Sequence, residues 1–260
     1  MDSLYDYHRD YGRVSNSMLS VFRQSPLLYY KRCIERSVTD EESEALRVGR
    51  MMHSWLLEKP AFWGRYCREL VADRRTKAGK LAAEMWKSLR RGREPVTAAD
   101  EAMLIGMEAG VARHADLSAL LAADGVVEKP IFFELDGVPC RAKPDKVFPE
   151  ARLILDLKSS ASADPAEFRW SVKKFGYANQ QAWYEDALKQ QYGGDWSFLF
   201  AVIQKVEPFE VSLVELPRRQ VEAAREENMK ALADLKRRVE SGDWTRFQGV
   251  TVLEGESWQR

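Results

Sequence analysis

The segment CRAKPDKVFPEARLILDLKSS, residues 140–160, constrains this chain more than any other stretch. The apolar run Leu153 to Leu155 predicts a buried strand that ends near Asp156 and Lys158. Successive side chains of a strand point to opposite faces, so Asp156 and Lys158 share one face and Leu157 points to the other. The sequence therefore predicts a carboxylate and an ammonium side by side where a buried strand ends.

A second carboxylate, Asp145, lies eleven residues before Asp156. Because Pro144 is a poor residue for a central strand, Asp145 is expected to begin another strand or to lie on a bend beside the first. Carboxylates are the hard oxygen ligands that Mg²⁺ prefers, and an ammonium can hold water or offset negative charge. A D-x-K tripeptide alone usually marks a solvated strand end, but the added Pro-Asp favours a minimal Mg²⁺ site for phosphodiester cleavage.

Further segments match a known family in the same order. GRMMH (residues 49–53), KPD (143–145), DLK (156–158) and QQAWY (180–184), with SNSMLSVFRQSPLLYYK near the start, resemble the PD-(D/E)XK nuclease superfamily. The resemblance is greatest to the exodeoxyribonuclease VIII (RecE) type, which is related to the phage lambda exonuclease and to RecB nuclease domains. It spans nearly the whole chain, including RRTKAGK, VEKPIFFE and the Trp-containing tail.

The resemblance implies a restriction-endonuclease-like α/β (α+β) fold, in which helices flank a central mixed sheet. It also implies a Mg²⁺-dependent DNA exonuclease, with Mn²⁺ as a substitute and one or two ions per active site. Such an enzyme degrades linear double-stranded DNA processively from 5′ to 3′ and leaves 3′ single-stranded overhangs for phage-type recombination. The expected partners are DNA ends, further copies of the chain in a ring of three or four, and a single-strand annealing protein.

Metal ligands follow from the matching positions. Asp145 and Asp156 are the expected carboxylate ligands, Leu157 offers only its backbone carbonyl, and Glu128 is a further candidate. His53 matches the family's G-x-x-x-H element, in which the histidine ligates or orients around the metal and Gly49 is expected to allow a close backbone approach. A single histidine on an apolar helical face is otherwise more often a core residue.

The expected catalytic residues are Asp145, Asp156, Lys158, Gln180 and Tyr184. Lys158 should contact the attacking water or the scissile phosphate, with a pKa that a nearby cation lowers. Gln180 and Tyr184 are four residues apart and share a helical face, as the family's Q-x-x-x-Y element requires. Gln180 is expected to hydrogen-bond the lysine, the water or the phosphate, and Tyr184 to support the strand. Tyr177 is a weaker member of this set.

Net charge is zero, with forty basic and forty acidic residues, so any DNA contact must come from local patches. Residues 65–93 hold ten Lys or Arg and three Asp or Glu, which is consistent either with phosphate contact or with a solvated helix pair. The candidate phosphate-binding residues are Ser17, Arg23, Arg74, Arg75, Lys77 and Lys80.

A length of 260 residues suits a single nuclease domain. Three scattered cysteines favour a reducing compartment over a metal cluster, and no apolar run is long enough to span a membrane. The start does not resemble a signal peptide. We therefore expect a cytoplasmic protein of phage or prophage origin, with no membrane partner.

Hydrophobic periodicity divides the domain into a mainly helical part (1–125), a sheet core (126–216), and a C-terminal helix and tail (217–260). Strands are expected at 126–135, 138–148, 153–157, 197–204 and 209–216. Helices are expected at 44–58, 77–90, 97–112, 118–122, 166–191 and 218–240, with another starting at Ser15 or Ser17. The aromatic residues Trp170, Phe175 and Trp183 are expected to pack in the core rather than to stack on bases.

Two alternatives stay open. A structure-specific or restriction-type endonuclease shares the fold, and a non-catalytic DNA-binding module could keep it. No G-x-x-x-x-G-K-[ST] loop is present, so hydrolysis should not require ATP.

Overall fold

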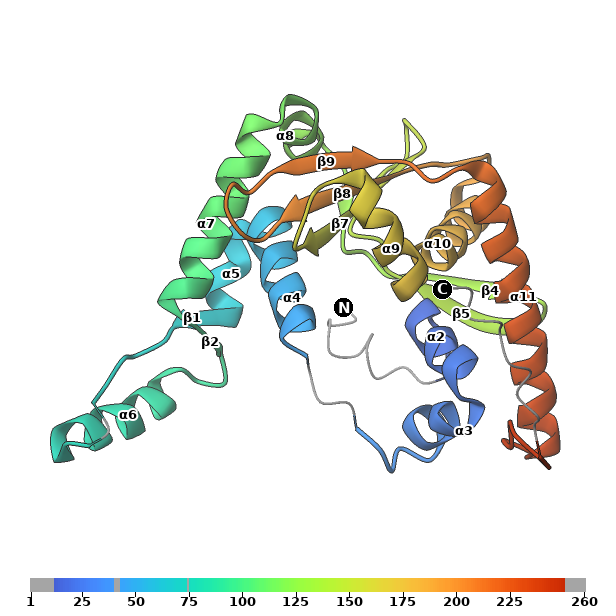
Figure 1. The fold of residues 1–260 in the computed structure, drawn as a ribbon, viewed down its shortest axis with the longest axis horizontal. Helices are drawn as coiled ribbons and strands as arrows, with labels where there is room; N and C mark the ends of the chain where they lie inside the picture. Colours follow the sequence, from blue (N-terminus) through green and yellow to red (C-terminus); the bar gives the residue numbers. More distant parts are fainter. Residues whose placement is uncertain (1–11, 40–42, 74, 251–260) are drawn as a thin grey trace, which may run out of the picture.

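A mixed sheet of five strands lies at the centre of the computed structural model, which describes residues 12–39, 43–73 and 75–250 (Figure 1). Its order is β3 (Val126–Val127), β6 (Lys146–Phe148), β7 (Leu153–Ser160), β8 (Ser197–Gln204) and β9 (Val211–Val214). β7 and β8 run parallel, and the other neighbours are antiparallel. Two smaller sheets are the hairpin of β4 (Ile131–Leu135) and β5 (Val138–Ala142), and the parallel pair of β1 (Tyr66–Arg68) and β2 (Glu94–Val96).

Helices cover both faces of this sheet, which confirms the expected fold class (Figure 1). Before the sheet come α2 (Asn16–Gln24), α3 (Pro26–Tyr29), the π-helix η1 (Tyr30–Ile34), α4 (Glu44–Leu57), α5 (Lys59–Arg65), α6 (Lys77–Leu89), α7 (Ala98–Arg113) and α8 (Ala115–Ala122). Within and after it come α9 (Pro165–Phe175), α10 (Tyr177–Tyr192) and α11 (Arg218–Ser241).

Alternation along β7 divides the core into two clusters. Ile154 packs with residues of α2, α9, α10 and α11 on one face. Leu155 and Leu157 pack with α4, α5, α7 and α8 on the other. Trp183 of α10 is fully buried, and its indole N–H donates to the carbonyl of Arg141 at 3.0 Å. Helices on both faces therefore hold β7 in place, which fixes the residues at its end.

Local sequence explains several boundaries. The hydroxyl of Ser15 caps α2, and Thr97 with Asp100 forms a capping box at the start of α7. The ammonium of Lys146 lies against the C-terminus of α8, where it donates to the carbonyls of Leu120, Leu121 and Ala123. Lysine at this position satisfies carbonyls that have no partner within the helix.

Three predicted elements are interrupted. The strand expected at 126–135 breaks at Glu128, whose φ is +50°, and the one expected at 138–148 breaks before Asp145. Pro130 and Pro144 lie at these breaks, where a proline supplies no N–H for a strand ladder. The helix expected at 166–191 divides at Gly176, which adopts the left-handed conformation with φ +66°.

The expectation that the aromatic residues of this helical stretch all pack in the core is wrong. Trp183 is buried, but Trp170 is 62% exposed and Phe175 is 53% exposed. The turn at Gly176 gives α9 a different direction from α10, so the two helices do not share one buried face (Figure 1).

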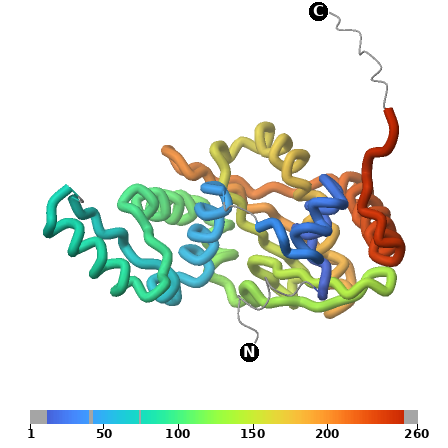
Figure 2. Tube along the Cα trace, turned by 90° about the horizontal axis from the view of Figure 1, so that it is seen from below, coloured from blue at the N-terminus to red at the C-terminus, as the bar shows by residue number. Residues whose placement is uncertain are grey.

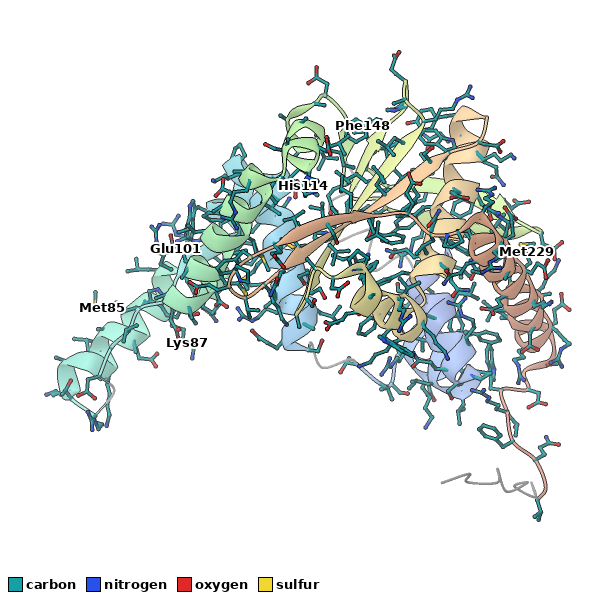
Figure 3. The ribbon with its side chains drawn as sticks, turned by 45° about the horizontal axis from the view of Figure 1, so that its top comes forward. Met85, Lys87, Glu101, His114, Phe148 and Met229 are labelled. Atoms are coloured by element: carbon teal, nitrogen blue, oxygen red, sulfur yellow. The ribbon has the colours of Figure 1, made fainter. Side chains whose placement is uncertain are left out.

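α6 projects from one end of the molecule, and α11 borders the opposite end (Figures 1 and 2). No residue of α6 is buried, and Figure 3 shows Met85 and Lys87 on this projection, beyond Glu101 of α7. α6 therefore adds little to the core. Within the described residues, no helix has the length and hydropathy needed to cross a membrane.

Gly49 does not allow the close backbone approach that its motif suggested. Apart from Gly49 itself, its two chain neighbours and the backbone of its own helix, no atom of the described residues lies within 4 Å of the position that a Cβ would take. Gly110 of α7 is the opposite case, because a Cβ there would lie 2.1 Å from the carbonyl oxygen of Phe209.

These two helical glycines predict opposite effects of one substitution. Gly49→Ala should raise the free energy of unfolding by about 1 kcal/mol, because alanine favours helix over glycine and meets no neighbour. Gly110→Ala should lower it by about 1–3 kcal/mol, because the backbone of the β8–β9 turn must move. Urea denaturation of both variants measures the difference, and equal shifts would contradict the packing of α7 on this turn.

Candidate active site

The second half of β7 has an open edge beside β6. The two strands pair only from Leu153 to Leu155, so the backbone of Leu157 finds no partner in β6. Side chains take that place: the N–H of Leu157 donates to Asp145 Oδ2 at 2.7 Å, and its carbonyl accepts from His53 Nε2 at 2.9 Å. One residue of β7 thus fixes a carboxylate and an imidazole.

His53, Glu128 and Asp145 form a cluster at this edge. One ligand atom from each lies within 4.8 Å of the other two. His53 Nδ1 is 3.3 Å from Asp145 Oδ1 and 3.5 Å from Glu128 Oε1. Glu128 reaches the cluster because its backbone turns with a positive φ, and its N–H donates to the carbonyl of Asp145 at 2.9 Å. The break in the predicted strand is therefore what directs Glu128 inward.

Asp156 and Lys158 follow on the same face of β7, as alternation predicts. The ammonium of Lys158 contacts Asp156 Oδ2 in an ion pair. Asp156 is fully buried, and its other oxygen, Oδ1, has no partner among the described residues. Because the oxygens of a buried carboxylate are normally both satisfied, Oδ1 can accept a further positive partner.

Two groups of α10 contact Lys158, and a third supports one of them. Its ammonium donates to Gln180 Oε1 at 2.9 Å and lies 4.6 Å from the ring centroid of Tyr177. The amide of Gln180 donates in turn to the hydroxyl of Tyr184 at 3.1 Å. A continuous series of polar contacts therefore runs from Asp156 through Lys158 and Gln180 to Tyr184. Its last contact, between Gln180 and Tyr184, follows from their i, i+4 spacing on α10.

The charges of the cluster shift several pKa values. Burial raises the pKa of Asp145 to about 7, although His53 opposes that shift. Burial would lower the pKa of His53, but Asp145 and Glu128 outweigh it and raise that pKa to about 9. Burial also disfavours charge on Lys158, yet Asp156 and Asp145 raise its pKa. This direction is opposite to the lowering expected from a cation, because the charges nearest to Lys158 are these two carboxylates.

The donor set fits a divalent cation. Asp145 and Glu128 bring carboxylate oxygens, His53 brings a ring nitrogen, and the carbonyl of Leu157 faces the same edge. Asp156 adds a third carboxylate, near enough for its charge to raise the pKa of Asp145. Oxygen-rich sets with one imidazole suit Mg²⁺ or Mn²⁺. The orphaned Oδ1 of Asp156 is the observation that supports this fit.

The structure brings together all the expected catalytic and metal residues but not the expected phosphate contacts. Arg23 donates to Asn228 Oδ1 at 2.7 Å, and the exposed Arg75 pairs with Asp73. Lys77 and Lys80 lie on the projecting α6, and Ser17 is exposed in the first turn of α2. Arg74 lies outside the described residues.

Sequence reasoning missed Lys143. Its ammonium forms an ion pair with Glu128, and both side chains are nearly buried. The available signal was its position two residues before Asp145, in the same Lys-Pro-Asp tripeptide.

The pKa of His53 predicts that metal binding releases a proton. A ring with a pKa of about 9 is protonated at neutral pH and must lose a proton to bind a cation. Affinity for Mn²⁺ should therefore rise from pH 6 to pH 9, by up to about tenfold per pH unit for one released proton. Calorimetry in buffers of different ionisation enthalpy measures this release.

The variant His53→Gln should release fewer protons on Mn²⁺ binding than wild type, because glutamine has no ring proton to lose. His114→Gln is the matched control, because His114 accepts from the N–H of Leu117 at the start of α8. Equal proton release by wild type and His53→Gln would contradict a ligating role for His53.

Comparison with known proteins shows the fold that this chain shares with a solved structure. The fold is similar to that of a candidate exonuclease from Eubacterium rectale, with a TM-score of 0.65 and 18% identity over 93% of this chain and 86% of that one. A phage-related exonuclease from Haemophilus somnus 129PT has a TM-score of 0.37 and 15% identity, over 64% of this chain and 84% of that one. The latter likeness is too weak to support an argument, and no curated protein matches the sequence.

The family model described as "PDDEXK-like domain of unknown function (DUF3799)" matches residues 15–246. This range includes every residue of the cluster at β7. The chain belongs to this PDDEXK-like family and has the fold of the PD-(D/E)XK nucleases.

Proposed function

We propose that this chain is a Mg²⁺-dependent DNA exonuclease in which residues 1–260 form one nuclease domain. The observation that carries the proposal is the buried Asp156 carboxylate, whose Oδ2 pairs with Lys158 while its Oδ1 has no partner among the described residues. It lies one residue from Leu157, which binds both Asp145 and His53. Buried charges of this kind are costly to fold and cluster at functional sites.

Asp145, Asp156, His53 and the Leu157 carbonyl would hold the cation, with Glu128 as a further ligand. One or two Mg²⁺ ions, or Mn²⁺ in their place, supply Lewis acidity to the phosphate and lower the pKa of water. The protein's own part is to fix these groups before DNA arrives.

Lys158 would act on the reacting phosphate or on the attacking water. Asp156, Gln180 and Tyr177 restrain its ammonium from three sides, so it enters the reaction already oriented. Tyr184 restrains Gln180 in turn. The ammonium offsets the negative charge that develops as the P–O bond breaks.

The DNA would extend from this site to α6. This helix and the turn after it carry Lys77, Lys80, Lys87, Arg90 and Arg91 against a single acid, Glu84. A projecting, exposed and basic helix suits contact with backbone phosphates.

Finer features of the proposal rest on the resemblance of the motifs. They are 5′ to 3′ polarity, processive digestion with 3′ overhangs, a ring of three or four copies, and a single-strand annealing protein as partner in phage-type recombination. The same resemblance supports a cytoplasmic protein.

The ion pair of Asp156 and Lys158 predicts a sharp loss of activity. Asp156→Asn and Lys158→Met should each reduce cleavage in Mg²⁺ by about 100-fold or more, because each removes charge from the reacting centre. The matched control is the exposed pair of Lys189 and Asp195. Lys189→Met and Asp195→Asn should keep wild-type rates.

The metal dependence follows from the same site. Ca²⁺ should support DNA binding without cleavage, because its loose coordination holds the reacting groups poorly. Gel-shift and cleavage assays of one preparation measure both. Rapid cleavage in Ca²⁺ alone or in EDTA would exclude this mechanism.

Exonuclease and endonuclease action are separated by the form of the DNA. Linear duplexes are labelled either at the 5′ end or at the 3′ end of a strand, with and without a 5′-phosphate. In Mg²⁺ the 5′-end label should be released before the 3′-end label. A covalently closed circular plasmid should stay intact in the same tube. Cutting of the circle at the rate of the linear form would instead favour an endonuclease.

A further inference from the structure

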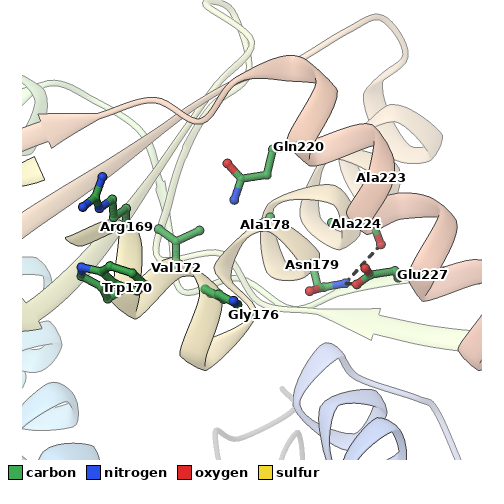
Figure 4. A pocket seen from close by; sticks show the side chains of 11 residues that line it. Arg169, Trp170, Val172, Gly176, Ala178, Asn179, Gln220, Ala223, Ala224 and Glu227 are labelled. Atoms are coloured by element: carbon green, nitrogen blue, oxygen red, sulfur yellow. Dashed lines mark hydrogen bonds between the residues drawn. The ribbon is translucent and has the colours of Figure 1, made fainter. Parts of the chain in front are cut away.

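A groove of about 620 Å³ lies between α9, α10 and α11, outside the β7 cluster (Figure 4). Arg169 and Trp170 of α9 lie on one side of it, and Gln220 and Glu227 of α11 lie on the other (Figure 4). Asn179 of α10 lies between the two walls. The groove thus has an aromatic and basic wall opposite an amide and carboxylate wall.

The basic wall has the chemistry of a stacking platform. Trp170 is 62% exposed, so the core does not account for it. The guanidinium of Arg169 lies 5.1 Å from the centroid of the Trp170 ring, and the exposed Lys173 follows on the same helix. Proteins that bind single-stranded nucleic acid use exposed aromatic rings beside cations, because bases stack on the ring and phosphates meet the charges.

The opposite wall can hydrogen-bond a base edge. The amide nitrogen of Asn179 donates to the carbonyl of Ala224 and to Glu227 Oε2, both at 3.2 Å (Figure 4). These bonds tie Glu227 to the floor of the groove. The amide of Gln220 and the carboxylate of Glu227 together present both a donor and acceptors, which is what recognition of an unpaired base edge needs.

One turn of helix joins the groove to the β7 cluster. Gly176, Ala178 and Asn179 line the groove. Tyr177 and Gln180, from the same turn, contact Lys158. A strand in the groove would therefore lie across α10 from the reacting phosphate.

We propose that this groove binds a nucleotide of single-stranded DNA, with its base on Trp170 and its phosphate at Arg169 and Lys173. Gln220 and Glu227 face the edge of that base. The proposal rests on the proposed nuclease function, since a duplex exonuclease handles a single strand next to the cut. The groove would hold that strand while Lys158 acts on the neighbouring phosphate.

Binding without cleavage tests the groove separately from the nuclease. Fluorescence anisotropy of a labelled oligothymidylate in EDTA should show affinity weakened about 5- to 100-fold in Trp170→Ala, because one stacked base is lost. Trp170→Phe should restore most of the affinity. Tyr192→Ala is the control, because Tyr192 is 41% exposed and does not line the groove. Unchanged affinity in Trp170→Ala would overturn the proposal.

Crosslinking locates the strand directly. An oligonucleotide that carries 5-iododeoxyuridine should crosslink on irradiation to the peptide that contains Trp170, and a crosslink confined to other peptides would overturn the site. Binding of thymidine monophosphate with the same affinity as the oligonucleotide would assign the groove to a free nucleotide and overturn strand binding. If binding depends on Trp170 but the protein cleaves no DNA under any condition, the strand-binding proposal stands and only the proposed nuclease function is overturned.

Discussion

The whole site depends on the unpaired backbone of Leu157. A strand inside a sheet gives its N–H and carbonyl groups to both neighbours, and a buried group without a partner is costly. β6 begins at Lys146, opposite Leu155, and does not extend as far as Leu157. Asp145 and His53 supply the missing partners. A gap in a hydrogen-bond ladder thus becomes the device that aligns two ligand groups.

Pro144 explains why the pairing of the two strands stops there. Proline lacks the N–H that would continue the pairing, and it lies between β5 and β6. The left-handed turn at Glu128 opens the neighbouring strand in the same region and brings a third carboxylate inward. Both irregularities occur beside the site, where strained or broken strands are expected if function requires them.

The buried charges are the cost of this arrangement. Asp156 is fully buried with Lys158 as its ion-pair partner, and a buried pair contributes little net stability. Helices on both faces of the sheet supply the apolar packing that offsets this cost. Gln180 and Tyr184 of α10 keep Lys158 oriented, and Trp183 of the same helix is buried in the core. One helix therefore serves both the core and the site.

The sequence by itself determined the strand of Leu153 to Leu157, the shared face of Asp156 and Lys158, and the i, i+4 pairing of Gln180 and Tyr184. These features are local, because they follow from the periods of strand and helix. Only the tertiary structure decided that His53 bonds to Leu157, that Lys143 pairs with Glu128, and that Trp170 is exposed. Such contacts join residues up to 104 positions apart or depend on the direction of a helix after a turn, and no local period encodes either.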